Sequence, residues 1–373
     1  MQVQVLSRAL VMASLFEKAE KWVERRERRI SSLALILGFI FDSLTLKRVD
    51  LLFENLTVLS YLVVSGSSII LLNYYKEHPP EKNFLIKIQR FLPFFIQFAF
   101  GGLFSAFFIF YTRSAALASS WPFVLILLFL FIGNEFFKER YERLTFLVSI
   151  YFVAIFSFSI FFAPVVLKIM GADIFVLSGL VSLLVIYLFT KLLFKFAPSI
   201  SLDSKTNLTR SILSIFVVIN ILYFTNLIPP IPLSLKEAGV YHSIERVGDN
   251  YQVVGEKNKW YESLLSPEKV HITEGSSLYV FSSVFAPTDL DTRITHDWQY
   301  FDETLGEWTS VTKVDFYILG GRGEGYRGFS VKENVSGGKW RVDVKTDRGQ
   351  IIGRIRFDVE TGSSQVVFEN KVL

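Results

Sequence analysis

The chain has 373 residues, of which 51% are hydrophobic, and its formal net charge is +4. A hydrophobic share this large at this length excludes an ordinary soluble globular protein. The absence of cysteine excludes disulfides, thiolate catalysis and cysteine-ligated metals. Residues 1–235 carry 22 Lys and Arg against 14 Asp and Glu, whereas residues 236–373 carry 17 against 21. The basic surplus lies in short segments between hydrophobic runs, which favours a topology signal over nucleic-acid binding.

The first segment, residues 1–30, alternates acidic and basic side chains between Glu17 and Arg29. Pairs such as Glu17 and Lys21 have the spacing that supports a helix. A cleavable signal peptide is not expected, because the basic cluster at 25–29 follows a weak apolar run instead of preceding it. We predict a cytoplasmic amphipathic basic helix that lies on the membrane surface.

Residues 31–228 are predicted to form a multi-pass transmembrane region, an all-α bundle of about seven helices. Each hydrophobic run is long enough to cross about 30 Å of hydrocarbon. The runs lie near residues 31–46, 51–75, 91–112, 115–134, 144–167, 172–194 and 208–228. The first run is short and contains Asp42, so the alternative is six spans, with a different topology.

Orientation follows from the Lys and Arg residues of the connecting segments, since positive residues stay on the cytoplasmic side. Alternate segments, starting with the N-terminal one and counted with the residues at the ends of the adjoining runs, hold 18 Lys and Arg, and the remaining segments hold 4. With seven spans, the N-terminus is cytoplasmic and the C-terminal domain lies outside. A domain outside the cytoplasm that needs no disulfide fits a bacterial envelope. We therefore predict a multi-pass protein of the bacterial inner membrane with a periplasmic C-terminal domain.

The C-terminal part begins with a proline-rich juxtamembrane linker at residues 229–240, because its three prolines cannot continue a helix. From residue 241 to 373 the pattern changes to strand-like alternation. In residues 294–300, 340–345 and 354–359, apolar or aromatic positions alternate with polar or charged ones. Residues 346–349 and 305–306 have the composition of hairpin turns. We predict an all-β immunoglobulin-like sandwich.

Several motifs of this domain resemble the bacterial domain-of-unknown-function family twenty-nine fourteen. They are His296-Asp-Trp298, Gly325-Tyr-Arg-Gly-Phe-Ser330, Gly338-Lys-Trp-Arg-Val-Asp-Val344 and the run from Thr346 to Val359. The helical region and residues 226–241 are similar to membrane halves fused to that domain. The resemblance implies a bacterial inner-membrane protein, and it brings no activity and no catalytic residue.

Candidate contact residues of the β-domain lie beside its turns. The glycine-rich loop at 319–328 contains Arg322 and Arg327, and such a loop could hold an anion. The alternative is a turn that needs positive φ angles. Trp308 and Tyr326 are candidates for contact with a partner at the surface. Trp298 and Trp340 alternate in phase with apolar neighbours, which predicts core positions; they are therefore not counted as contact residues.

Polar residues within the predicted spans are the candidates for an intramembrane site. They are Asp42, Gln97 and Asn220. The alternative places Asp42 at the outer interface and uses Gln97 and Asn220 for hydrogen bonds between helices. Gly101-Gly102 indicates close packing of helices in preference to transport.

No motif of an enzyme or metal site occurs, and the four histidines are isolated in the sequence, so we predict no cofactor and no metal. His296 is predicted to be a structural strand residue. The leading hypothesis is a non-enzymatic membrane protein whose outward sandwich binds an envelope protein or glycan. The alternatives are a small transporter or channel with an accessory β-domain, and a membrane-embedded enzyme. The sequence leaves the oligomeric state open.

Overall fold

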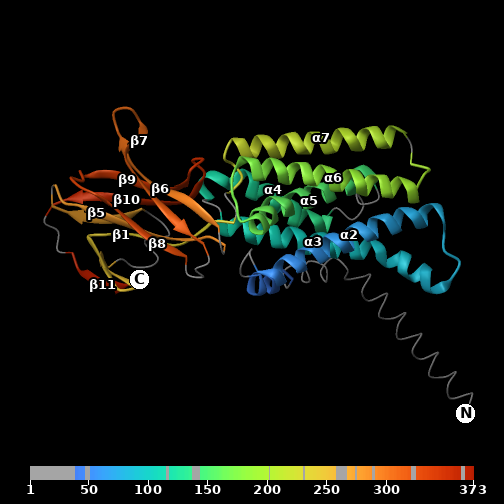
Figure 1. Ribbon diagram of the computed structural model, residues 1–373, viewed down its shortest axis with the longest axis horizontal. Helices are drawn as coiled ribbons and strands as arrows, with labels where there is room; N and C mark the ends of the chain where they lie inside the picture. Colours follow the sequence, from blue (N-terminus) through green and yellow to red (C-terminus); the bar gives the residue numbers. More distant parts are fainter. Residues whose placement is uncertain are drawn as a thin grey trace, which may run out of the picture.

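The computed structural model describes residues 38–46, 51–114, 117–136, 143–200, 202–229, 232–257, 267–273, 275–287, 290–320, 325–362 and 366–373. Helices lie side by side in a bundle, and strands gather beyond one end of it (Figure 1). The helices are α2 (Leu52–Glu77), α3 (Asn83–Ser114), α4 (Leu117–Phe136), α5 (Leu144–Leu167), α6 (Ala172–Phe196) and α7 (Leu202–Phe224). Residues 38–45 are also helical. The predicted surface helix at 1–30 lies outside the described residues.

Five of the described helices, α2, α3, α5, α6 and α7, are long and apolar enough to cross a membrane. The described apolar part of α4, Trp121–Asn134, is shorter. The predicted first span, 31–46, is described only from residue 38. Helices that could span a membrane are therefore confirmed, whereas the count of seven spans stays a prediction.

The bounds of most helices agree with the hydrophobic runs, and α5 matches its run at both ends. Two helices begin earlier than predicted, because α3 begins at Asn83 and α7 at Leu202. Their added N-terminal residues include charged side chains such as Lys87 and Asp203, which a hydrophobic run excludes but a helix tolerates at a membrane surface. Helix α7 ends at Phe224, before the predicted 228, because Asn226 has a left-handed φ of 58°.

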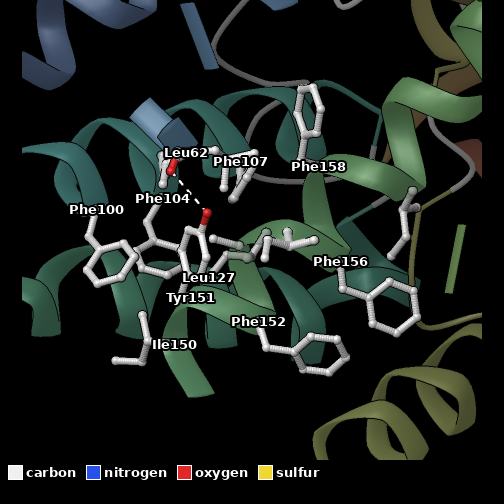
Figure 2. Packing of buried hydrophobic residues seen from close by; sticks show 14 of the residues in the cluster. Leu62, Phe100, Phe104, Phe107, Leu127, Ile150, Tyr151, Phe152, Phe156 and Phe158 are labelled. Atoms are coloured by element: carbon white, nitrogen blue, oxygen red, sulfur yellow. Dashed lines mark hydrogen bonds between the residues drawn. The ribbon is translucent and has the colours of Figure 1, made fainter. Parts of the chain in front are cut away.

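Helix α5 is the centre of the bundle, and phenylalanine supplies most of its packing. Its side chains Phe152 and Phe156 are fully buried in a cluster shared with α2, α3 and α4 (Figure 2). The hydroxyl of Tyr151 donates to the main-chain oxygen of Leu62 in α2 at 3.2 Å. This contact depends on Gly66, where a Cβ atom would collide with the Tyr151 ring. The aromatic core therefore holds α2 directly against α5.

Glycines also allow close packing around α3, as Gly101-Gly102 predicted. A Cβ atom at Gly102 would lie 2.6 Å from the ring of Tyr61 in α2. One at Gly101 would lie 3.2 Å from the side-chain nitrogen of Asn134 in α4. The close-packing interpretation of this glycine pair is confirmed.

The outside of the bundle is apolar, which is the reverse of a soluble helical protein. Helix α6 exposes a stripe of large aliphatic side chains along its length. They are Val176, Leu177, Leu180, Val181, Leu184, Val185, Leu188 and Leu192, each at least 40% exposed. Water around such a stripe would be unfavourable, whereas hydrocarbon chains would not.

The two ends of the bundle differ. At one end, the hydroxyl and main-chain nitrogen of Ser199, after α6, donate to Glu77 at the end of α2. At the other end, the hydroxyl of Tyr223 in α7 donates to the main-chain oxygen of Gly171, before α6, at 3.1 Å. The guanidinium of Arg348 from the β-domain lies 4.3 Å from the centre of the Tyr223 ring. The β-domain therefore contacts the end of the bundle opposite to Glu77 and Ser199 (Figure 1).

The β-domain is built from three antiparallel or mixed sheets. Their strand orders are β1-β5-β8, β4-β10-β9-β6-β7 and β11-β3-β2. The strands are β1 (Ser234–Tyr241), β2 (Ser243–Val247), β3 (Asn250–Glu256), β4 (Glu268–Ile272), β5 (Leu278–Phe285), β6 (Asp291–Asp302), β7 (Glu307–Leu319), β8 (Tyr326–Lys332), β9 (Gly338–Thr346), β10 (Ile351–Thr361) and β11 (Phe368–Val372). Strand β1 begins at Ser234, inside the segment that was predicted as linker.

The five-stranded sheet packs on the β1-β5-β8 sheet to form a β-sandwich. The core contains Trp298 and Trp340 from one sheet and Val280 from the other. Both tryptophans are almost fully buried, so their predicted core positions are confirmed. The turns at Gly306 and Gly349 have φ angles of 68° and 76°, as the two hairpin predictions require. The small β11-β3-β2 sheet covers the other side of β5, where Tyr251 packs against Phe281.

Candidate functional site

The five-stranded sheet has an outer face, which we define as the side turned away from β1, β5 and β8. Strand register places alternate side chains of the sheet on it. Among the side chains that the structure describes, the cations of this face are Lys269, Arg293, Lys313, Lys339, Arg341, Lys345, Arg354 and Arg356, and its carboxylates are Asp297, Asp315, Asp343, Asp358 and Glu360. The outer face is therefore basic, although residues 236–373 as a whole have 17 Lys and Arg against 21 Asp and Glu.

Two buried carboxylates form the base of the outer face. Asp297 and Asp343 are 3% and 1% exposed. The ammonium group of Lys345 lies 2.5 Å from Asp297, and Arg354 donates to both carboxylate oxygens of Asp343, at 2.5 and 2.9 Å. Burial alone would raise the pKa of Asp297, but hydrogen bonds led by that from Lys345 outweigh it and hold the pKa below its usual value. Asp297 is thus held in its charged form, and Asp343 accepts hydrogen bonds from the cationic side chain of Arg354.

Two aromatic side chains lie on this charged base, each with an arginine stacked on it. The guanidinium of Arg341 is 4.4 Å from the centre of the Trp308 ring, and its Nε donates to Gln299 at 2.7 Å. The guanidinium of Arg293 is 4.8 Å from the centre of the Tyr317 ring and donates to the Tyr317 hydroxyl. Tyr317 is 65% exposed. These stacks hold flat, amphipathic groups in fixed positions at the surface.

The predicted contact residues fall on different sheets. Trp308 lies at the start of β7 on the outer face, partly exposed beside Phe301. Tyr326 begins β8, in the other sheet of the sandwich, and packs half-buried against the inner core. Arg327 donates to the main-chain oxygen of Asp249 at 3.4 Å. Arg322 lies outside the described residues. Trp308 therefore does not share a site with Tyr326 and Arg327.

The end of the glycine-rich loop supports the turn interpretation. Gly325 has a φ of 89°, and a Cβ atom there would lie 3.0 Å from the main chain of Val284. Both facts require glycine at this position. The neighbouring residues 321–324 lie outside the described part, so an anion site in this loop stays a prediction.

The predicted intramembrane candidates do not form one cluster in the described residues. Asp42 is 8% exposed and lies beside Ser105 of α3. The main-chain oxygen of Gln97 accepts a hydrogen bond from Asn134 of α4 at 2.9 Å, so this position does join two helices. Asn220 instead donates to Phe216 in its own helix at 2.8 Å, because that carbonyl is the nearest one a turn earlier. Among the described residues, the side-chain nitrogen of Asn220 therefore does not form the predicted hydrogen bond between helices.

His296 belongs to a buried hydrogen-bonded group that joins the two sheets of the sandwich. Its Nε2 lies 2.7 Å from the hydroxyl of Ser282 in β5, and its Nδ1 lies 2.8 Å from that of Ser330 in β8. The indole nitrogen of Trp298 donates to Ser330 at 2.9 Å. Burial lowers the pKa of His296 to about 3. A serine next to a histidine suggests catalysis, but a neutral, weakly basic imidazole in a closed core supports the structural role that the sequence predicted.

Two other histidines come together around one carboxylate, which corrects their description as isolated. Glu256 accepts hydrogen bonds from the Nε2 of His242 at 3.0 Å and from the Nδ1 of His271 at 2.8 Å. Sequence reasoning missed this cluster because β3 and β4 meet only through the fold of the sandwich. Within the described part of the chain, no group of three or more His, Asp or Glu side chains could hold a metal ion.

The family model described as "Protein of unknown function (DUF2914)" matches residues 291–359. This match confirms the family resemblance of the C-terminal region. The matched residues run from the start of β6 into β10, and therefore contain most of the outer face. No curated protein matches the chain.

Several solved structures show weak similarity. An immunoglobulin-like protein from Pseudomonas aeruginosa is 13% identical, with 34% of this chain and 96% of that chain covered and a TM-score of 0.20. A β-glucosidase from Listeria innocua is 10% identical, with 31% and 16% covered and a TM-score of 0.18. An alkylpurine DNA glycosylase from Pseudomonas fluorescens is 10% identical, with 84% and 100% covered and a TM-score of 0.21. Scores this low carry no functional argument.

Proposed function

We propose that this chain is a multi-pass protein of the bacterial inner membrane that presents its β-sandwich to the periplasm, where the outer face binds an acidic envelope protein. The observation that carries the proposal is the outer face itself, with Trp308 and Tyr317 held by stacked arginines on a charged base. Trp, Tyr and Arg are the side chains that contribute most to protein–protein binding.

The orientation rests on the charges at the two ends of the bundle. The segment between α2 and α3 lies at the end opposite to the β-domain, and the residues around it include Lys76, Lys82, Lys87 and Arg90. The segment between α5 and α6, which faces the β-domain, contains Lys168 as its one Lys or Arg. Positive residues are retained in the cytoplasm, so the β-domain lies on the opposite side of the membrane.

The charge of the outer face decides the kind of partner. Its described cations outnumber its described carboxylates, and the buried carboxylates Asp297 and Asp343 are already paired with Lys345 and Arg354. Three more cations have carboxylate partners at the surface, namely Lys269, Arg293 and Lys339. Exposed cations such as Lys313 and Arg356 remain available to an acidic surface. An acidic protein surface with apolar groups at its centre would match both the cations and the aromatic rings. An anionic glycan is the other outcome that the experiment below separates.

Crosslinking in intact cells tests the proposal. The chain has no cysteine, so a Ser310→Cys variant can carry a single photo-crosslinker on the outer face. A Glu369→Cys variant carries the same group on β11, on a different sheet. We expect a protein adduct from residue 310 and little from residue 369. Adducts that contain an anionic glycan would show that the partner is a glycan and not a protein. Equal adduct yields from residues 310 and 369 would contradict binding at the outer face.

Removing the aromatic side chain of Trp308 should weaken the complex with the partner. We expect Trp308→Ala, introduced with Ser310→Cys, to lower the adduct yield at least about tenfold, the usual effect at the centre of an interface. Phe368→Ala is the matched control, because Phe368 is an exposed aromatic residue that lies on β11, away from the outer face. An unchanged yield with Trp308→Ala would show that the outer face does not bind the partner.

A further inference from the structure

A cavity of about 110 Å³ lies where the helical bundle meets the β-domain. Its apolar side is formed by Pro164 near the end of α5, Phe175 near the start of α6 and Met170 between the two helices. Its polar side is formed by the loop between β9 and β10, which contributes Thr346 and Arg348. The cavity therefore lies at the level where a hydrocarbon layer would meet water.

Two hydrogen-bond donors of this cavity have no partner in the structure. The hydroxyl of Thr346 is buried without a hydrogen bond, and the whole residue is only 8% exposed. The Nη1 of Arg348 is buried and also without a hydrogen bond. Buried donors are nearly always satisfied in folded proteins, so two of them lining one cavity indicate a missing acceptor. Neither donor belongs to the outer face described above.

The surroundings hold these donors in place. Arg348 stacks on Tyr223 at 4.3 Å, and Gln350 donates to the main-chain oxygen of Ile228 at 3.4 Å. Gly171, another residue of the cavity, directly precedes α6, and no side chain caps this helix. The positive end of the α6 dipole is therefore directed to the same space.

The chemistry of the cavity selects a singly charged oxyanion. A guanidinium, a hydroxyl and a helix N-terminus all donate hydrogen bonds and favour negative charge. Two carboxylates lie nearby, since Asp347 lines the cavity and Asp173 is in the first turn of α6. Their repulsion disfavours a doubly charged phosphate but tolerates a phosphodiester, which carries one charge.

The lipid-facing residues next to the cavity point to the source of this group. Val166 and Leu167 end α5, Ile169 follows them before α6, and each is more than 40% exposed. Acyl chains can lie against these side chains while the headgroup reaches the polar loop. We propose that the cavity binds the phosphodiester of a membrane phospholipid, with Thr346 and Arg348 as its hydrogen-bond donors. This proposal rests on the membrane location but not on the partner of the outer face.

Native mass spectrometry of the full-length protein in detergent tests this site with three probes. Phosphatidylglycerol supplies both the phosphodiester and the acyl chains, diacylglycerol supplies only the chains, and inorganic phosphate supplies only the anion. We expect retention of phosphatidylglycerol and no comparable retention of diacylglycerol. Inorganic phosphate that binds as well as the lipid would overturn the lipid assignment, and equal retention of diacylglycerol would overturn the anion site.

Variants of the two donors identify the site on the chain. Thr346→Val keeps the shape of the side chain, and Arg348→Gln keeps a polar group of similar length. We expect each to lower the affinity for phosphatidylglycerol about tenfold or more, while Arg246→Gln on β2 leaves it unchanged. Crosslinking from Ser310→Cys serves as the readout for correct folding and for the separate outer-face function. Unchanged lipid affinity in both donor variants would overturn the proposal.

Discussion

Mild acid is expected to destabilise the β-sandwich through His296. The native state holds this imidazole neutral, since burial lowers its pKa to about 3, whereas the unfolded chain binds a proton near the ordinary histidine value of about 6.5. Stability is therefore full above about pH 6.5 and falls as the pH decreases toward the native pKa. Between pH 6.5 and 4.5 we expect His296 to contribute a loss of about 2–3 kcal/mol.

Guanidinium unfolding of the full-length protein in detergent, followed by tryptophan fluorescence, measures this loss. A His296→Gln variant should be less stable at pH 7, because the hydrogen bonds to Ser282 and Ser330 change, but its stability should depend much less on pH over this range. His78→Gln, at an exposed histidine after α2, should keep the pH dependence of the original chain. A pH dependence that survives in His296→Gln would show that another group controls it.

Arg354→Leu is expected to cost about 3 kcal/mol of folding free energy, the lower end of the range for breaking a buried ion pair. The substitution leaves the carboxylate of Asp343, which is 1% exposed, without its two hydrogen bonds from the guanidinium. Lys345 remains 3.4 Å from Asp343 and offsets part of the loss. Unfolding in guanidinium chloride, as described for His296, measures the difference in folding free energy between the variant and the original chain.

A surface ion pair provides the matched comparison for Arg354. Lys371 and Glu369 lie 3.4 Å apart, but both side chains are more than 40% exposed. Lys371→Leu should therefore change the stability little, because water solvates the remaining carboxylate. The combined change Arg354→Leu and Asp343→Leu should recover much of the loss, since it removes the buried charge as well as its partner. A loss of folding free energy of less than about 1 kcal/mol for Arg354→Leu would contradict the prediction that the buried Asp343 carboxylate needs Arg354 as its partner.

Local patterns in the sequence were sufficient for the elements whose environment repeats along the chain. The bounds of α5 follow from one uninterrupted apolar run, and the core positions of Trp298 and Trp340 follow from strict alternation. Gly349 was predictable because a tight hairpin needs a positive φ. In each case one physical requirement, such as burial on one side of a strand or a positive φ in a turn, determines the residue types within a short stretch of sequence.

Contacts between distant segments were not predictable in this way. Arg348 lies on Tyr223, and Glu256 meets His271, only after the bundle and the sheets have formed. The seven-residue alternation of β6 predicted which side of the strand Asp297 occupies, but not that Lys345 and Ser310 would bury and pair it. The cavity beside Thr346 depends on two domains at once, so no single stretch of sequence contains its signal.

We expect the helices to cross a membrane and to place the β-domain on its outer side. Single cysteines in this cysteine-free chain test it by labelling with a maleimide that cannot cross the inner membrane. Ser310→Cys lies on the outer face of the sandwich, and Glu81→Cys lies between α2 and α3 at the other end of the bundle. We predict labelling of Ser310→Cys in intact cells and of Glu81→Cys only after the inner membrane is opened. The opposite pattern, or labelling of both in intact cells, would contradict it.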